Sequence, residues 1–482
     1  MICMNRDRRS FLLSSVAAPF VQTRKRSTTR PNLVLFMTDD HGAWATGAYG
    51  ARGILTPHID RLASGGARFT RAFAATPVCS PSRMTWMTGC LPATHRVEDW
   101  LLPEDSFGPK SRDWLDGLLT WPEVLKARGY TTAMCGKWHM GRDDQAQRGF
   151  TEWATVPGGS GTYRNPTFVH NGRPQPIQGF KEDALGDFAL DFLAQQKNGH
   201  NFALLMPFYA PHTPFDFTPD RYRAAYRDSA FPDFPDTPVH AAQNPQLQSM
   251  HGNRDAKLGY SSLVTAADAN IGRVLQRLAE LGLRDNTLVV FSADQGWCAG
   301  HHGVWGKGNG TVPYNMYEES IRVPLIWNRP RAIVPAAPAP MVSSYDFFPT
   351  LLEYLGIDAP PPDAKRVGRS YAGFLQGAPP RQWTNRLFFE YSYVRALRTQ
   401  TLKYVERGEG WPSELFDLEG DPGEATNLID APAYRAQREA LRRELEARFK
   451  KLGAPPIDKW RSISPQIPPA ESHGPGKTIG PG

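Results

Sequence analysis

A cysteine-centred stretch between residues 76 and 89 has the residue types of a reaction centre. Cys79-Ser80-Pro81-Ser82-Arg83 is followed by apolar residues and Thr88-Gly89. This order predicts a loop that enters a helix, with Pro81 in the first turn, where a missing N–H costs little. The backbone N–H groups of that turn, together with Arg83, would attract an anion. Cys79 is then either a thiol nucleophile of lowered pKa or a small buried residue beside a helix cap.

Two polar pairs indicate a metal site. Asp39-Asp40 and Asp294-Gln295 supply three carboxylates and one amide oxygen, which are the oxygen ligands that hard cations such as Ca2+ or Mg2+ prefer. One such pair alone can equally cap a helix or form a turn. Because both pairs directly follow an apolar run, we interpret the four residues as metal ligands.

Basic and imidazole side chains follow further apolar runs or a Gly-rich loop. Lys137 and His139 flank Trp138, so in an extended chain they point to the same side. His212 lies between two prolines, and Lys307 follows a Gly-rich segment. Each has an ordinary alternative as a solvated surface residue, a packed histidine or part of a flexible loop. Cations grouped around one dication and one nucleophile would suit transfer of a tetrahedral anionic group.

Four apolar runs of strand length would position these side chains. The runs are Asn32–Thr38, Tyr130–Cys135, Phe202–Tyr209 and Thr287–Ala293. Helical segments beside them are Trp121–Arg128, Lys181–Gln196 and Ser261–Leu281. Continuous hydrophobic runs are typical of strands buried on both faces of a parallel sheet. Since open α/β sheets bind ligands beyond the carboxyl ends of their strands, we expect an α/β fold with one site at that edge.

These motifs resemble those of the type I, formylglycine-dependent sulfatases of the alkaline phosphatase superfamily. The matching segments are Asp39-Asp40, Cys79 to Arg83 with Thr88-Gly89, Gly136 to His139, Pro211-His212, Asp294 to Gly303, Lys307, Tyr317 to Pro324, Asp346 to Leu351 and Glu414 to Pro422. The resemblance implies a large mixed, mostly parallel sheet sandwiched by helices, plus a smaller C-terminal α+β domain with a short antiparallel sheet and a helix. It also implies an enzyme, a sulfuric ester hydrolase that releases inorganic sulfate.

The resemblance further implies a modified nucleophile and a metal. A formylglycine-generating enzyme would oxidise Cys79 to formylglycine, whose hydrate attacks sulfur and gives a covalent sulfoenzyme. Asp39, Asp40, Asp294 and Gln295 would hold a Ca2+ ion, and Mg2+ is the less expected occupant.

The remaining matched residues receive roles by the same resemblance. Lys137 and Lys307 would bind sulfate oxygens, and Arg83 would hold the aldehyde hydrate. His212 would protonate the leaving alcohol. His139 would then take a proton from the remaining hydroxyl, which expels sulfate and regenerates the aldehyde.

The substrate is expected to be a sulfated small molecule or glycan. Aromatic and amide side chains near a sulfate site suit a sugar, so we favour a sulfated carbohydrate. Loop residues that could line the leaving-group pocket are Trp100, Tyr163, Asn309 and Asn315. The alternatives are an arylsulfatase of broad specificity, a phosphonate or phosphodiester hydrolase of the same superfamily, and a non-catalytic relative that binds sulfated glycans.

The N-terminus carries most of the net charge of +7. The first 30 residues hold seven Arg and Lys against one Asp, so the rest is nearly neutral and no global basic field indicates a nucleic-acid partner. Arg8-Arg9 followed by an apolar run to Val21 resembles a twin-arginine (Tat) export signal. The run is too short to cross a bilayer as a helix. We therefore expect Tat export to the bacterial periplasm or exterior, and no transmembrane segment.

The chain divides into four predicted segments. They are 1–30 (export signal and basic linker), 31–380 (catalytic domain), 385–455 (C-terminal subdomain with antiparallel strands and a helix over Ala433–Leu452) and 456–482 (a Pro/Gly-rich tail). Five cysteines without CxxC spacing predict no essential disulfide. Gly158–Gly179 and Phe215–Gly252 lack periodicity and are expected to be long loops that either wall a functional site or are mobile.

Overall fold

Four adjacent parallel strands form the centre of the large sheet. The computed structural model describes residues 30–196, 200–358, 360, 365–408 and 410–457. Within them, β1 (Asn32–Thr38) pairs with both β9 (Thr287–Ala293) and β8 (Phe202–Pro207), and β8 pairs with β4 (Thr131–Gly136). These are the four apolar runs of the sequence. Their predicted burial in a parallel sheet is confirmed.

Shorter strands extend this sheet on both sides. Beyond β9 lie β13 (Leu325–Asn328) and β2 (Ala67–Arg68), and beyond β4 lie β5 (Glu152–Thr155), β6 (Thr167–His170) and β7 (Arg173–Pro176). The sheet is therefore mixed and largely parallel, as predicted. The stretch Gly158–Gly179 is not a plain loop, because β6 and β7 form an antiparallel hairpin there. Asn171-Gly172 turns it with both φ positive, the signature of a tight hairpin, and the prolines of β7 suit an edge strand.

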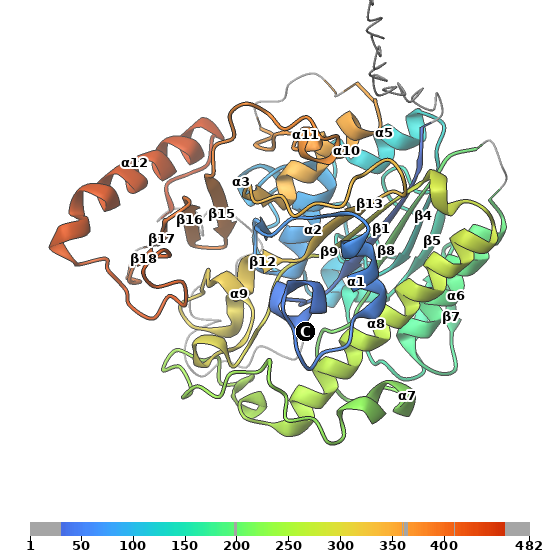
Figure 1. Cartoon of the computed structure of the whole chain (residues 1–482), viewed down its shortest axis with the longest axis horizontal. Helices are drawn as coiled ribbons and strands as arrows, with labels where there is room; N and C mark the ends of the chain where they lie inside the picture. Colours follow the sequence, from blue (N-terminus) through green and yellow to red (C-terminus); the bar gives the residue numbers. More distant parts are fainter. Residues whose placement is uncertain (1–29, 197–199, 359, 361–364, 409, 458–482) are drawn as a thin grey trace, which may run out of the picture. The chain divides into compact units, whose positions relative to one another are not determined.

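Helices cover both faces of the sheet (Figure 1). Leu33, Leu35 and Met37 of β1 pack with residues of α2 (Cys79–Thr88), α5 (Trp121–Ala127) and α10 (Phe347–Tyr354). Val34 and Phe36 face the opposite way, against α1 (Pro57–Ser64), α6 (Lys181–Ala194) and α8 (Arg254–Glu280). This alternation is the period-2 geometry of a strand buried on both faces. The helix predicted over Ser261–Leu281 was too short at its N-terminal end. The helix begins at Arg254, after the Asn253 cap, and its first residues are largely polar, so the apolar pattern did not reveal them.

A second sheet lies towards the C-terminus. It is antiparallel, in the order β15 (Leu387–Tyr391), β16 (Val394–Arg398), β17 (Leu402–Arg407) and β18 (Glu414–Asp417), with α12 (Arg435–Lys451) packed on it (Figure 1). The predicted short antiparallel sheet and helix are confirmed. Residues of this sheet share one hydrophobic cluster with Phe73, Ala75 and Val78 from the segment that leads into α2. The exact domain bounds stay predictions.

Small elements complete the described chain. The short helices are α3 (Pro92–His95), α4 (Pro103–Ser106), α7 (Asp220–Arg223), α9 (Glu318–Ile321) and α11 (Ala372–Leu375). The short strands are β3 (Ala72–Phe73), β12 (Arg322–Val323) and β14 (Val342–Ser343), which form one small sheet, and β10 (Cys298–Ala299) and β11 (Trp305–Gly306), which form another. The predicted export signal (1–29) and the tail from residue 458 lie outside the described residues.

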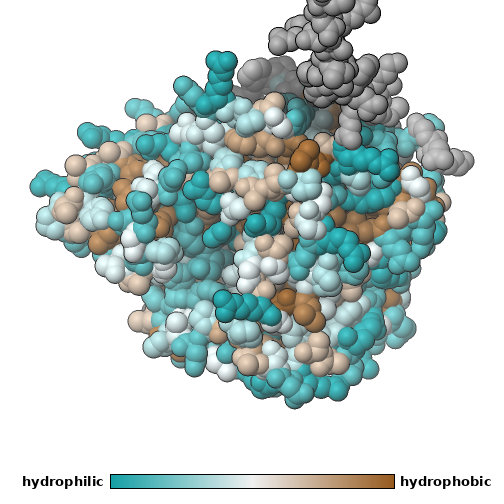
Figure 2. Space-filling view, in the orientation of Figure 1, coloured by the Kyte–Doolittle hydropathy of each residue, from teal (hydrophilic) through white to brown (hydrophobic). Residues whose placement is uncertain are grey.

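The surface is mostly polar on the face seen in Figure 1. Hydrophilic residues predominate there and hydrophobic ones are scattered (Figure 2). None of the described helices is long and apolar enough to cross a membrane. The four cysteines within the described ranges, Cys79, Cys90, Cys135 and Cys298, are all free and buried, so no disulfide joins them.

Candidate active site

Strand register brings the two acidic pairs together. Thr38 of β1 pairs with Ala293 of β9, so the next residues, Asp39 and Asp294, leave the sheet side by side. The backbone N–H of Asp40 then donates to Asp294 Oδ1 at 3.3 Å. All three carboxylates are buried. Asp40 has a φ of 61°, a left-handed conformation that turns the chain immediately after β1.

The first turn of α2 meets this acidic cluster. Cys79 and Arg83 are four residues apart, so they share one face of the helix. Cys79 Sγ lies 3.4 Å from Asp39 Oδ1, and Arg83 bridges Asp39 Oδ2 at 3.1 Å and Asp294 Oδ2 at 2.7 Å. Ser82 Oγ donates to the Asp294 carbonyl oxygen. The helix is thus joined directly to the ends of β1 and β9.

Two lysines from other segments form ion pairs with the acidic cluster. Lys137, directly after β4, has its Nζ 2.6 Å from Asp39 Oδ2. Lys307 has its Nζ 2.8 Å from both Asp40 Oδ1 and Cys79 Sγ. Burial favours the neutral form of Asp39, but the positive charges of Lys137 and Arg83 hold its pKa well below the ordinary value.

The two predicted histidines lie beside the cluster as neutral groups. His212 has its Nε2 3.7 Å from Asp40 Oδ2, while Nδ1 donates to the Thr213 carbonyl oxygen at 2.5 Å. Burial and Lys137 lower the pKa of His212 to about 4. His139 Nε2 donates to the Leu101 carbonyl oxygen at 2.8 Å. The expectation of extended backbone is wrong at His139, whose φ of 58° is left-handed.

The donor set fits a hard dication. Asp40 Oδ2 and Gln295 Oε1 are buried and accept no hydrogen bond from the described residues, which is costly in a closed site. Gln295 Nε2 instead faces Asp39 Oδ1 at 3.1 Å and Asp40 Oδ1 at 2.7 Å. Exchanging the amide oxygen and nitrogen would turn Oε1 towards the carboxylates, and a cation bound there would satisfy both orphaned oxygens.

The environment of Cys79 disfavours a thiolate. Burial and the nearby Asp39 raise the pKa of the thiol to about 11, so at neutral pH it carries its proton. A thiolate nucleophile needs the opposite shift. Of the two alternatives left open for an unmodified Cys79, the reactive low-pKa thiol is therefore disfavoured.

Tyr163 and Asn315, which were expected in the substrate pocket, form contacts with the backbone of the loops that carry His212 and Lys307. Lys181, which the sequence analysis did not single out, contacts the residue that leads into the His212 loop. Tyr163 donates its hydroxyl to the His212 carbonyl oxygen at 2.7 Å, and the Asn315 amide donates to the Lys307 carbonyl oxygen at 3.0 Å. Lys181 Nζ lies 3.8 Å from the ring centre of Tyr209, which leads into the His212 loop. The Tyr163 and Lys181 contacts join residues 49 and 28 positions apart, so no local sequence signal marks them, whereas Asn315 and Lys307 are eight positions apart.

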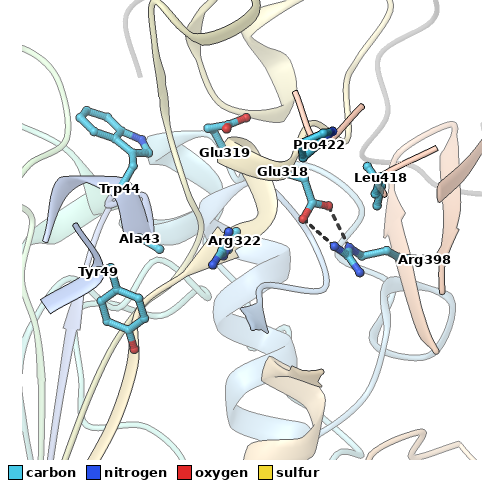
Figure 3. A pocket seen from close by; sticks show the side chains of 9 residues that line it. All are labelled: Ala43, Trp44, Tyr49, Glu318, Glu319, Arg322, Arg398, Leu418 and Pro422. Carbon is cyan, nitrogen blue, oxygen red and sulfur yellow. Dashed lines mark hydrogen bonds and ion pairs between the residues drawn. The ribbon is translucent and has the colours of Figure 1, made fainter. Parts of the chain in front are cut away.

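One cavity in the described structure has a lining that shares no residue with this cluster. It measures about 220 Å³ and lies between the segment after β1, α9 and the C-terminal sheet (Figure 3). Its lining residues are Ala43, Trp44, Tyr49, Glu318, Glu319, Arg322, Arg398, Leu418 and Pro422. None of the predicted site residues lines it. The predicted reaction centre is instead a closed group of paired charges.

Comparison with known families shows which family the chain belongs to. The family model described as "Sulfatase" matches residues 31–357, and the one for the C-terminal part of N-sulphoglucosamine sulphohydrolase matches residues 300–451. The chain belongs to the sulfatase family. The predicted family is thereby confirmed, and with it the assignment as a hydrolase.

Individual relatives of this sulfatase cover most of its length. An N-acetylglucosamine-6-O-sulfatase of Bacteroides thetaiotaomicron is 28% identical over 90% of this chain and 88% of its own. Human arylsulfatase A is 30% identical over 84% of each chain. A solved structure of a protein in complex with its substrate D-glucosamine-2-N,6-O-disulfate has 25% identity and a TM-score of 0.76, and the match covers 89% of this chain and all of that one.

Proposed function

We propose that this sulfatase releases sulfate from a sulfated carbohydrate, with residue 79 in the formylglycine form and Ca2+ bound by Asp39, Asp40, Asp294 and Gln295. The observation that carries the proposal is the place of residue 79. Its sulfur lies within 3.4 Å of Asp39 Oδ1 and 2.8 Å of Lys307 Nζ, at the meeting point of the acidic and basic groups. A carbohydrate substrate is supported by a relative named N-acetylglucosamine-6-O-sulfatase and by a related structure in complex with its substrate D-glucosamine-2-N,6-O-disulfate.

The charged side chains would bind and orient the sulfate group. A bound Ca2+ would supply Lewis acidity towards a sulfate oxygen. Lys137 and Lys307, now paired with Asp39 and Asp40, would contact sulfate oxygens and offset their negative charge. Arg83 is fixed by both Asp39 and Asp294, so it can hold residue 79 in one orientation.

The two histidines differ in which nitrogen is available for proton transfer. His212 donates from Nδ1 to a backbone carbonyl, which leaves Nε2 facing the cluster without a proton in the neutral form. Once Nε2 has taken up a proton from solvent, the imidazolium can deliver that proton to the leaving alcohol. His139 donates from Nε2, which leaves Nδ1 buried and without a hydrogen-bond partner in the described residues. The lone pair on His139 Nδ1 would therefore be suited to accept a proton from residue 79.

Sulfate release from a panel of monosaccharide sulfates tests this function. Protein co-produced with a formylglycine-generating enzyme should release sulfate, detected by ion chromatography, and Cys79→Ala protein should not. Faster turnover of matched phosphate or phosphonate esters would favour the other hydrolases of the superfamily. Binding of sulfated sugar with no release by converted protein would favour a non-catalytic relative.

A further inference from the structure

The segment Glu98–Leu101 connects the predicted reaction centre to the C-terminal sheet. On one side, the Leu101 N–H donates to Ser80 Oγ at 3.0 Å and the Leu101 carbonyl oxygen accepts from His139 at 2.8 Å. On the other side, the Ser392 N–H donates to the Glu98 carbonyl oxygen at 3.1 Å. The segment therefore lies between residues next to Cys79 and the turn that joins β15 to β16.

Asp99 is held in place within this segment by one of its two oxygens. Oδ1 accepts from the Tyr391 hydroxyl at 2.8 Å and from the Trp100 N–H at 2.8 Å. Oδ2 accepts no hydrogen bond from the described residues, and Asp99 retains 7% of its exposure. Oδ2 is not one of the fully buried side-chain oxygens that lack a partner, so water or a ligand group can reach it.

The surroundings of Asp99 keep it ionised near neutral pH. Burial raises its pKa to about 6, while Tyr391, Trp100 and Lys307 oppose the shift. Lys307 is also the lysine whose Nζ lies 2.8 Å from Cys79 Sγ. The free oxygen therefore carries negative charge and belongs to the electrostatic surroundings of the sulfate position. A negative charge at Asp99 would repel sulfate, so this carboxylate is not suited to bind the sulfate group itself.

We propose that Asp99 is a specificity-determining residue: Oδ2 accepts a hydrogen bond from a hydroxyl or ammonium group of the leaving sugar and disfavours an anionic substituent at that position. Tyr391 is its positioning residue, since its hydroxyl fixes Oδ1. This inference rests on the proposed function. It narrows the substrate class to sugar sulfates with a hydrogen-bond donor beside the scissile ester. Charge-assisted hydrogen bonds of this kind are the strong ones.

The test compares substrates rather than rates alone. The kcat/KM of the best sugar sulfate in the panel is divided by that of 4-nitrophenyl sulfate, which offers no donor. Asp99→Asn keeps an acceptor for Tyr391 and Trp100 but removes the charge. It should lower the ratio about tenfold or more, and it should raise relative turnover of glucosamine 2-N,6-O-disulfate against glucosamine 6-O-sulfate. Tyr391→Phe should lower the ratio in the same direction, and Glu104→Gln, an exposed acid five residues away, should not.

Three outcomes would overturn the assignment. An equal loss of kcat/KM on both esters would give Asp99 a structural role, and an unchanged kcat/KM on both esters would show that Asp99 does not contact the leaving group. Turnover of the aryl ester with no sugar sulfate turned over would contradict the donor requirement. Absence of turnover of every sulfate ester by converted wild-type protein would instead contradict the proposed function itself.

Discussion

At the scale of single residues, the predicted reaction centre contains three carboxylates and three positively charged side chains. Arg83, Lys137 and Lys307 pair with Asp39, Asp40 and Asp294, and each group is buried. Buried charges survive only when paired. Burial, and after it the negative charge of Asp39, raise the pKa of Asp294 to about 7. A dication would offset that negative charge.

The metal assignment predicts a stability effect that needs no turnover. Millimolar Ca2+ should raise the melting temperature of the purified protein by a few degrees, because a ligand that binds the folded state stabilises it. Asp294→Asn removes one charge from the site and should lose most of that increment. Differential scanning fluorimetry measures both. Asp285→Asn, an exposed acid paired with Arg331, is the matched control. An equal increment in all three proteins would contradict the assignment.

A second residue-scale prediction concerns acid stability. His95 Nδ1 accepts from the Val97 N–H at 3.2 Å, and burial lowers the pKa of this imidazole to about 3. Its folded pKa is below the unfolded value, so its contribution is complete above pH 6.5 and is lost as the pH falls. The loss is on the order of 2 kcal/mol by pH 5.

The comparison uses His95→Asn, whose Oδ1 can replace the Nδ1 acceptor without titrating. Urea unfolding at pH 7.5 and pH 5 should show a steeper decline in the free energy of unfolding for wild type than for the variant. Parallel declines would mean that His95 is not buried in its neutral form.

At the scale of elements, the sequence was sufficient to predict the central strands and the polar residues that follow their carboxyl ends. The four apolar runs correspond to β1, β4, β8 and β9. The polar residues that come after these strands lie in one cluster, namely Asp39, Lys137, His212 and Asp294. Sequence reasoning could not find contacts between distant segments, such as Asp99 with Tyr391, which are 292 residues apart. Neither residue lies in a periodic pattern that predicts its partner. The β6–β7 hairpin, by contrast, had a usable signal in Asn171-Gly172.

A buried ion network joins α9 to the C-terminal sheet. Glu318 accepts from Arg398 through both oxygens at 3.0 Å and lies 3.3 Å from Lys403 Nζ (Figure 3 draws the Arg398 pair). Although burial favours its neutral form, Lys403 and Arg398 lower the pKa of Glu318. The Glu318 carboxylate is thus ionised and pairs with Arg398 of β16 and Lys403 of β17.

Removing that carboxylate should weaken the fold more than removing an exposed one. Glu318→Ala leaves Arg398 buried without this partner and should cost about 3–5 kcal/mol of unfolding free energy. Glu444→Ala breaks the exposed pair with Arg386 and should cost about 1 kcal/mol or less. Urea denaturation compares the two. Equal losses would show that the Glu318 network contributes no more than a surface pair.

At the scale of the whole molecule, the C-terminal sheet completes the catalytic part. Leu387, Phe389 and Leu397 share a hydrophobic cluster with Val78, the residue before the predicted nucleophile. The Ala93 N–H donates to Glu390 at 2.6 Å, which holds the segment that precedes Asp99. The smaller sheet, which was predicted as a subdomain, therefore packs against segments that lead to the predicted site.

The destination of the protein stays a prediction that rests on the N-terminal sequence alone. We propose Tat export, because Arg8-Arg9 precedes a short apolar run. In a bacterial host, Arg8→Lys with Arg9→Lys should move the protein from the periplasmic to the cytoplasmic fraction on immunoblots. Arg6→Lys, outside the pair, should leave export intact. Periplasmic protein in the double variant would contradict the assignment.

The central claim is that residue 79 acts as formylglycine, since a buried thiol whose pKa is raised to about 11 is a poor nucleophile. Mass spectrometry of the tryptic peptide Ala72–Arg83, from protein co-produced with a formylglycine-generating enzyme, tests it most directly. We predict the lower mass of an aldehyde in place of the thiol, together with sulfate release in proportion to the converted fraction. An unmodified cysteine, in a host where another type I sulfatase is converted, would contradict the account.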